Sequence, residues 1–223
     1  MSYNIVFDKS RKQDVIFEKI FKYGILNKYH VDRVDYNTYW EIYETEFAEQ
    51  HSSELTFIHE GLLSSKEKEL YLEYNHPQIS NFLVVKDNNK IIALFRSEQK
   101  EENLYYMRHA MVNKNYRRQG IYNDYLTKVI QYAKEMGFSQ IVSCFVAANN
   151  VIHQAKVKKE FYVSSFEIHP EYGNIIWLTH FLNDDLKKAF YFRSGMVEFS
   201  KKLFQNSEGN ANNLLNKILK SSQ

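Results

Sequence analysis

The segment from Met111 to Tyr122 carries the clearest chemical signal in this chain of 223 residues. A β-like run ends at Val112, the loop Arg117-Arg118-Gln119-Gly120 follows, and an amphipathic run begins at Ile121. The first turn of a helix has N–H groups with no internal partner and lies at the positive end of the helix dipole, so it attracts anions. A glycine lets the backbone approach a phosphate closely, and arginines add charge and forked donors. The segment therefore predicts a site for a phosphate-bearing ligand.

The composition indicates an ordinary globular protein, with 44% hydrophobic and 25% charged residues. The net charge of +2 gives no electrostatic footprint for nucleic acid. The single cysteine, Cys144, excludes internal disulfides, fits a reducing compartment and lies in an apolar run where a buried inert thiol is expected. No basic-then-apolar leader begins the sequence, and no apolar run reaches the ~20 residues of a membrane span. We expect a soluble, cytoplasmic protein that binds neither nucleic acid nor membrane.

The elements that must position the loop follow from the spacing of apolar and turn-forming residues. The first third is expected to be mostly helical after a short strand, and the middle to alternate strands and helices in a mixed α/β sheet. The expected strands cover residues 3–7, 81–86, 90–97, 104–112, 140–146, 161–168 and 174–181, and the expected helices cover residues 13–26, 38–49, 64–74, 121–136 and 149–159.

After residue 183 the sequence is helical again, over residues 184–192, 196–204 and 212–219. We expect a main domain over residues 1–182, with helices between 10 and 75 and the core sheet between 81 and 182. Residues 183–223 form a helical extension that packs on this domain. Alternatively, the extension covers the substrate cleft, or it pairs with a second subunit and the protein is a homodimer.

The loop resembles the coenzyme-binding loop of the GNAT superfamily of acyl-CoA-dependent N-acyltransferases (N-acetyltransferases). That loop has Gln or Arg, two variable positions, Gly, one variable position, and then Gly or Ala. Arg117 and Gly120 match this pattern, whereas Tyr122 stands where the family has a small residue. The Tyr122 ring must project away from a pyrophosphate if its N–H is to remain available.

A second segment, from Asn149 to Phe161, resembles the family's Asn-containing junction between a strand and a helix. The helix of that junction runs into a Gly-Phe pair, where this chain has Glu160 and Phe161. Counting back from Phe161 places Asn149 at the coenzyme-contacting Asn, with Asn150 one residue away. It also places Lys156 where a tyrosine often protonates the departing thiolate. The resemblance covers residues 81–181 approximately.

The resemblance implies an α/β (α+β) fold with a mixed, largely antiparallel central sheet flanked by helices. It also implies acetyl-CoA or coenzyme A as the acyl donor, with no metal, and a backbone N–H of Met111 or Val112 that polarises the thioester carbonyl. The implied coenzyme-binding residues are Met111, Val112, Arg117, Arg118, Gln119, Gly120, Ile121, Tyr122, Asn149, Asn150 and His153.

Acyl transfer also needs a base for the acceptor amine, and the strand before the loop offers Tyr106, Arg108 and His109. His109 has an ordinary pKa suited to this task, and its alternative role is a core histidine bonded to a carbonyl. Strand alternation places His109 on the face opposite Tyr106 and Arg108 unless a bulge intervenes, and the family commonly has one there. Glu98 and Glu101 are further candidates, expected in a solvated turn.

The proton for the departing thiolate would come from Lys156 or His153, on the helix that faces the coenzyme. A helix lysine is usually part of a solvated face, and the neighbouring lysines at 158 and 159 favour that interpretation. Tyr162 or a water molecule could substitute.

The acceptor is predicted to be a primary amine of a small molecule, with an amino sugar as one candidate. Aromatic side chains of the first helices and the late hairpin would line its pocket, because rings stack on apolar faces while tyrosine hydroxyls bind polar ones. The alternatives are an inactive module that only binds CoA, and an enzyme acting on a protein-borne or carrier-borne amine. The pocket candidates are Tyr36, Tyr39, Trp40, Tyr43, Tyr172 and Trp177.

Overall fold

The computed structural model describes residues 2–50, 79–147, 149–170 and 172–196, and positions 213, 216, 217 and 220. The chain divides into two compact units, Met1–His180 and Phe181–Gln223. The second unit contains α7 (Asp184–Arg193), whose first turn is capped by the side chain of Asn183. The packing of this extension on the main domain stays a prediction. The helices expected at 64–74, 196–204 and 212–219 lie wholly or largely outside the described residues.

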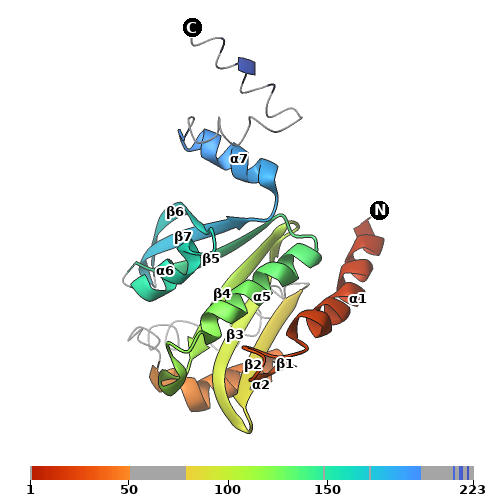
Figure 1. The fold of residues 1–223 in the computed structure, drawn as a ribbon, viewed down its shortest axis with the longest axis vertical. Coiled ribbons are helices and arrows are strands. Elements are labelled where there is room, and N and C mark those ends of the chain that lie inside the picture. The colour runs from red at the N-terminus through yellow and green to blue at the C-terminus, as the bar shows by residue number, and fades with distance from the viewer. Residues whose placement is uncertain are drawn as a thin grey trace. The chain divides into compact units, whose positions relative to one another are not determined.

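Seven strands form one sheet in the order β1-β2-β3-β4-β5-β7-β6 (Figure 1). Strands β1 to β4 pair antiparallel with their neighbours, β4 pairs parallel with β5, and β6 pairs antiparallel with β7. The sheet is therefore mixed and largely antiparallel, as predicted. The strands are β1 (His30–Val34), β2 (Ser80–Asp87), β3 (Lys90–Glu101), β4 (Leu104–Val112), β5 (Gln140–Val146), β6 (Tyr162–His169) and β7 (Gly173–Phe181).

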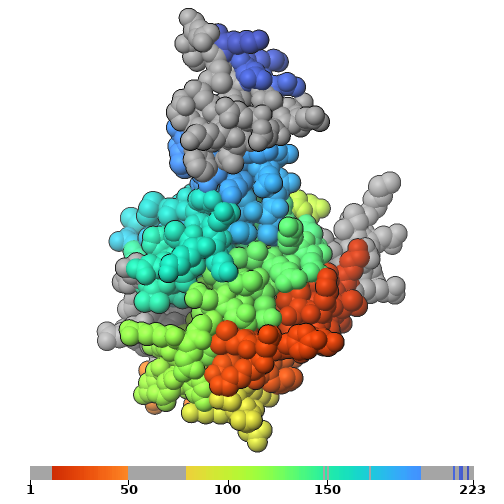
Figure 2. Space-filling model, in the orientation of Figure 1, coloured from red at the N-terminus to blue at the C-terminus, as the bar shows by residue number. Residues whose placement is uncertain are grey.

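One face of the sheet is covered by α5 (Ile121–Glu135), with α1 (Ser2–Phe21) beside it (Figure 2). The rings of Phe95 on β3 and Tyr125 on α5 stack at 3.8 Å between centroids. Lys19 and Glu135 join the two helices through an ion pair of 2.8 Å. We call this side the α5 face.

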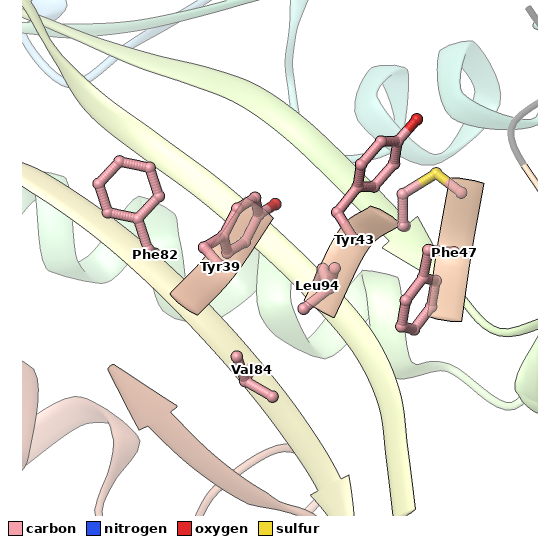
Figure 3. Packing of buried hydrophobic residues seen from close by; sticks show 7 residues of the cluster. Tyr39, Tyr43, Phe47, Phe82, Val84 and Leu94 are labelled. Carbon is pink, nitrogen blue, oxygen red and sulfur yellow. The ribbon is translucent and has the colours of Figure 1, made fainter. Parts of the chain in front are cut away.

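The opposite face is covered by α2 (Tyr36–Ile42) and the π-helical turn Tyr43–Phe47, and we call it the α2 face. Their aromatic side chains pack on apolar residues of β2, β3 and β4 (Figure 3). Because both faces are covered, the middle strands are continuously apolar, as in the run Phe82–Val85. The buried cluster consists of Tyr39, Tyr43, Phe47, Phe82, Val84, Leu94 and Met111.

The first thirty residues correct the sequence prediction. Residues 3–7, expected to be a strand, belong to α1, because five alternating residues also fit the start of an amphipathic helix. The helix ends at Phe21, earlier than expected. The turn after it needs Gly24, since a Cβ there would lie 1.9 Å from the carbonyl oxygen of Tyr29. The short charged strand β1 was not predicted, whereas the elements expected between residues 81 and 192 are all present.

Candidate active site

The sheet opens between β4 and β5. Strand β4 pairs with β3 as far as Val112, but it pairs with β5 only as far as Met107, which lies opposite Ser143. Among the described residues, the β4–β5 pairing therefore stops before residue 108, although β5 itself continues to Val146. We call residues 108–112 the β4 edge.

Two backbone N–H groups point toward this opening. The N–H of Asn113 donates to the carbonyl of Ile92 on β3 at 2.9 Å. Because successive N–H groups of a strand point in opposite directions, those of Ala110 and Val112 point away from β3. Of the two residues predicted to polarise a thioester, Val112 therefore has its N–H at the opening, while Met111 directs its side chain into the buried cluster.

A β-bulge in β4 decides which side chains share a face. His109 pairs with Arg96, but the next pair joins Met107 with Ser97, so Arg108 is the extra residue. The bulge brings Tyr106 and His109 to the same face of the sheet. The sequence alone left this question open.

The predicted anion loop begins at the end of β4. The side chain of Asn113 accepts from the N–H of Asn115, and Nε of Arg117 donates to the carbonyl of Val112 at 3.0 Å. Arg118 has φ +63° and Gly120 has φ +88°, so the chain turns through two left-handed residues before α5. Gly120 is the N-cap of α5 and provides no side-chain cap, so the first N–H groups of this helix remain available to a ligand.

The start of α5 is anchored from behind. Asp124 accepts from the N–H of Leu26 at 2.8 Å, and the side chain of Gln119 accepts from the hydroxyl of Tyr29 at 3.3 Å. Gln119 is thus occupied within the protein. The ring of Tyr122 lies 6.4 Å from the rings of both Phe95 and Tyr125, and burial raises its pKa well above the usual value. The Tyr122 side chain therefore points toward the sheet. This orientation leaves its backbone N–H accessible, although the family has a small residue at this position.

His109 lies among aromatic rings of the α2 face. Its Nδ1 shares a hydrogen bond of 2.7 Å with the hydroxyl of Tyr39, and its ring stacks on Trp40 at 5.8 Å. The ring of Tyr43 meets His109 edge-on at 5.2 Å. Burial, and next the nearby Tyr172 hydroxyl, raise the pKa of Tyr43. Three predicted pocket residues of the first helices, Tyr39, Trp40 and Tyr43, thus surround His109.

Tyr106 lies at the α2-face side of the opening. Its hydroxyl is 3.1 Å from Sγ of Cys144, the residue that follows the last β4–β5 pair. Its ring lies 5.6 Å from that of Trp177 on β7. Burial and then the neighbouring Cys144 raise the pKa of Tyr106 far above the ordinary value, so the hydroxyl keeps its proton.

Lys156, on α6 (Asn150–Val157), is 2% exposed, contrary to the expectation of a solvated helix face. Its Nζ donates to Oγ of Ser143, and Ser143 donates to the carbonyl of Met107 at 2.9 Å. The ammonium therefore lies at the residue pair where β4 and β5 separate. Burial lowers the pKa of Lys156 to about 8. Sequence reasoning missed Ser143, because a serine inside a strand carries no signal of its own.

The three coenzyme-binding residues predicted around the start of α6 stay predictions, and the structure gives their places. The side chain of Asn149 caps α6 by accepting from the N–H of Ile152 at 3.5 Å. Asn150 is the first residue of α6, and the ring of His153 stacks on Phe145 at 5.5 Å. Glu160 has φ +59°, the left-handed conformation that a glycine adopts readily. The backbone thus takes the glycine-like path although the residue is glutamate.

Glu98 and Glu101 do not share the solvated turn expected for them. Glu98 is 5% exposed within β3, because that strand runs on to Glu101. Its two carboxylate oxygens accept from Arg96 and from Arg108, each at 2.8 Å. Both carboxylate oxygens are therefore engaged within the protein, so Glu98 is badly placed to contact an acceptor amine.

Within the part of the chain that the structure describes, no cluster of three His, Cys, Asp or Glu side chains could hold a metal ion. Across those same residues, none of the helices has the length and apolarity that a membrane span requires.

Comparisons with known proteins agree with this geometry. No curated protein matches the sequence. Among solved structures, an N-acetyltransferase from Escherichia coli that acts on a ribosomal-protein alanine is 12% identical, with a TM-score of 0.53 over 70% of this chain and 94% of that one. A spermidine N-acetyltransferase chimera from Vibrio cholerae is 11% identical, with a TM-score of 0.53 over 70% of this chain and 96% of that one.

A third structure is a putative acetyltransferase from Salmonella typhimurium, determined with its cofactor acetyl-CoA. It is 12% identical, with a TM-score of 0.51 over 70% of this chain and 95% of that one. These likenesses show a shared fold. The model of the acetyltransferase (GNAT) family matches residues 36–157, which is more than half of the chain. The chain therefore belongs to the acetyltransferase (GNAT) family, and the predicted class of acyl-CoA-dependent N-acyltransferase is confirmed.

Proposed function

We propose that the protein transfers the acetyl group of acetyl-CoA to the primary amine of a small molecule by direct attack within a ternary complex. The observation that carries this proposal is the buried ammonium of Lys156 at the point where β4 and β5 separate. A buried cation is costly, and such groups occur most often where a shifted pKa serves chemistry. An inactive CoA-binding module would not need one.

The pyrophosphate of the donor would lie on the loop before α5. The N–H groups of residues 118–122 and the guanidinium of Arg118 would bind its oxygens, because Arg117 is directed at Val112 and Gln119 at Tyr29. The N–H of Val112 would polarise the thioester carbonyl from the β4 edge. The main chain would therefore supply most of the donor contacts.

Two titrating groups would carry the proton transfers. Lys156 would protonate the departing thiolate, since a donor with a pKa of about 8 is well matched to a thiol of ordinary pKa near 8.5. His109 would take the proton of the amine through Nε2 while its Nδ1–H donates to Tyr39. Tyr106 would act as a hydroxyl donor, because its raised pKa excludes it as a base.

The aromatic groups around His109 suit an acceptor with an apolar body. An amino sugar, a homodimer and a cytoplasmic location stay predictions, as does an acceptor amine on a protein or carrier.

Coenzyme A is expected to stabilise the protein against heat. At 100 times its dissociation constant, a ligand that binds only the folded state adds about 2.7 kcal/mol. For a chain of this size that corresponds to a rise in Tm of roughly 5–10 °C. Melting curves with and without CoA measure this shift. An unchanged Tm at millimolar CoA would contradict the donor site.

Replacing His109 by alanine is expected to lower kcat/KM for acetyl transfer by about 10²-fold near neutral pH, because the amine loses its base. CoA binding should be unchanged, since His109 lies on the α2 face and the anion loop lies at the start of α5. Initial rates between pH 6 and 9 and the CoA melting shift give the two readouts. Tyr39→Phe is the control, because it removes only the hydroxyl that orients Nδ1 and should have a smaller effect. A fully active His109→Ala enzyme would show that His109 is not the base and has a structural role instead.

A further inference from the structure

The amine of Lys156 is buried with few partners. Its side chain is 2% exposed, and its Nζ donates to Oγ of Ser143. Within the described part of the chain, no carboxylate pairs with this nitrogen and no second group accepts a hydrogen bond from it. The ring centroid of Phe145 lies 5.8 Å from Nζ. An ammonium has three N–H bonds, so two of them remain for a group that enters the opening between β4 and β5.

The hydrogen bonds around Ser143 also leave a lone pair on Nζ once the ammonium loses its proton. A hydroxyl has one proton to donate, and that of Ser143 is directed at the carbonyl of Met107 at 2.9 Å. Ser143 can therefore accept from Lys156 but cannot donate to it. In the neutral amine the lone pair of Nζ thus stays available for nucleophilic attack.

The neutral amine is well populated near pH 7. Burial lowers the pKa of Lys156 to about 8, and the charge of Cys144 acts on this pKa in the opposite direction. Of the titratable groups that the structure describes, Cys144 alone acts on Lys156 in this way. At pH 7 about one molecule in ten therefore carries the neutral amine, against fewer than about one in a thousand for an ordinary lysine.

Lys156 and the acceptor reach the opening from opposite faces of the sheet. Cys144 contacts Tyr106 on the α2 face, where His109 also lies. Because successive side chains of β5 alternate, Ser143 and its partner Lys156 lie on the α5 face. A thioester carbonyl is planar and can be attacked from either side. To protonate the departing sulfur, Nζ must contact it, and this contact also brings Nζ close to the carbonyl carbon one bond away.

We propose that Lys156 is itself an acetylation site, modified by the acetyl-CoA bound in its own active site when no acceptor amine is present. The neutral Nζ attacks the carbonyl carbon, a C–N bond forms, and the C–S bond breaks with its electron pair going to sulfur. The proton displaced from the nitrogen goes to the thiolate, so the products are CoA and an N-acetylated lysine. The inference rests on the donor site and the acid of the proposed function.

The modification would inhibit the enzyme. An amide nitrogen has no positive charge and does not protonate a thiolate, so the acetylated protein lacks its acid. Acetyl transfer to added amines should therefore fall in proportion to the fraction of Lys156 that is acetylated.

Peptide mass spectrometry of the wild-type protein incubated with acetyl-CoA, without an added amine, tests the inference. We expect acetylation of Lys156 to be about 10²-fold faster than that of Lys158, an exposed lysine just after α6. Its rate should rise about tenfold per pH unit up to the Lys156 pKa of about 8 and level off above it. Acetyl phosphate, which has no nucleotide, is the control for chemical acetylation and should show no preference for Lys156.

Two variants and one reagent identify the modified atom. Lys156→Arg should abolish the fast modification, because a guanidinium stays protonated and is no nucleophile. Cys144→Ser removes the other nucleophile at the opening and should not slow acetylation of Lys156. Neutral hydroxylamine cleaves a thioester on a cysteine and leaves an amide on a lysine intact.

Four results would overturn the inference: an unmodified Lys156, a Lys156 modified no faster than Lys158, the same preference with acetyl phosphate, or a hydroxylamine-sensitive acetyl group on Cys144. Each of them leaves the proposed function intact if the same protein acetylates added amines. A protein whose Tm does not rise with CoA would instead contradict the donor site, on which the proposed function and the inference both depend.

Discussion

Replacing Lys156 by methionine is expected to lower kcat for acetyl transfer by about 10²-fold or more, and to raise Tm in the same variant. Methionine has a similar length and a flexible apolar side chain, so it can occupy the same buried space. The two effects have opposite signs because the ammonium takes part in the reaction, whereas its burial destabilises the folded state.

The loss of activity follows from the protonation state of the acid. Lys156 can donate a proton only below its pKa of about 8, so the wild-type rate should fall as the pH rises through that value. The methionine variant has no such group and should lack this alkaline limb. Initial rates between pH 6 and 10 measure both the rate and the shape of the profile.

The gain in stability follows from the same pKa. Burial lowers the Lys156 pKa from 10.5 to about 8, so between these values the unfolded chain binds a proton that the folded chain does not. The wild-type free energy of unfolding should therefore rise with pH across this window. Below pH 8 both states are protonated and the folded state carries the full penalty, of about 3 kcal/mol. Methionine removes that penalty, so Tm at pH 7 should rise by several degrees.

Further variants make the test specific to the proton. Lys156→Tyr restores a titrating donor of ordinary pKa near 10, so part of the rate should return with the alkaline limb at higher pH. Lys156→Arg keeps the charge but not a usable proton and should stay slow. Ser143→Ala removes the hydrogen-bond acceptor of the ammonium and should move the limb to lower pH. A Lys156→Met enzyme with an unchanged rate and pH profile would show that the lysine takes no part in the reaction.

Replacing Gly120 by alanine is expected to weaken CoA binding by about 10-fold or more and to remove most of the CoA-induced rise in Tm. Gly120 has φ +88°, which costs an L-residue about 1–2 kcal/mol. A Cβ there meets only Cδ2 of Leu26, at an ordinary 3.7 Å, so packing does not oppose the change. The strain would instead shift the backbone of the loop and turn the first N–H groups of α5 away from the anion.

The chain offers a matched control at the other end of the same helix. Gly137 has φ +87°, and a Cβ there meets nothing within 4 Å, so Gly137→Ala should lose a similar amount of stability. It lies far along α5 from the loop and should keep the full CoA shift. The comparison separates a general loss of stability, caused by backbone strain, from a loss of CoA binding caused by strain in the loop. If CoA raised Tm equally in the two variants, the loop would not be part of the donor site.

Most of the local structure could be predicted because its causes lie within a few residues. Turn residues between β-branched runs predicted β2, β3 and β4, and the apolar spacing after Gly120 predicted α5. The failures occurred where short patterns are ambiguous. Five alternating residues at 3–7 fit both a strand and a helix, and the charged residues of β1 gave no strand signal although pairing with β2 forms one.

The family resemblance and most of the elements could be read from neighbouring residues alone, because a loop with Arg117 and Gly120 at a helix start depends only on local sequence. Tertiary structure alone decided the chemistry around it. The bulge at Arg108, the burial of Glu98 and the burial of Lys156 all depend on contacts with strands and helices distant in the sequence. Burial is a property of packing, and it is packing that turns a lysine typical of a solvated helix into one with a pKa of about 8 at the opening of the sheet.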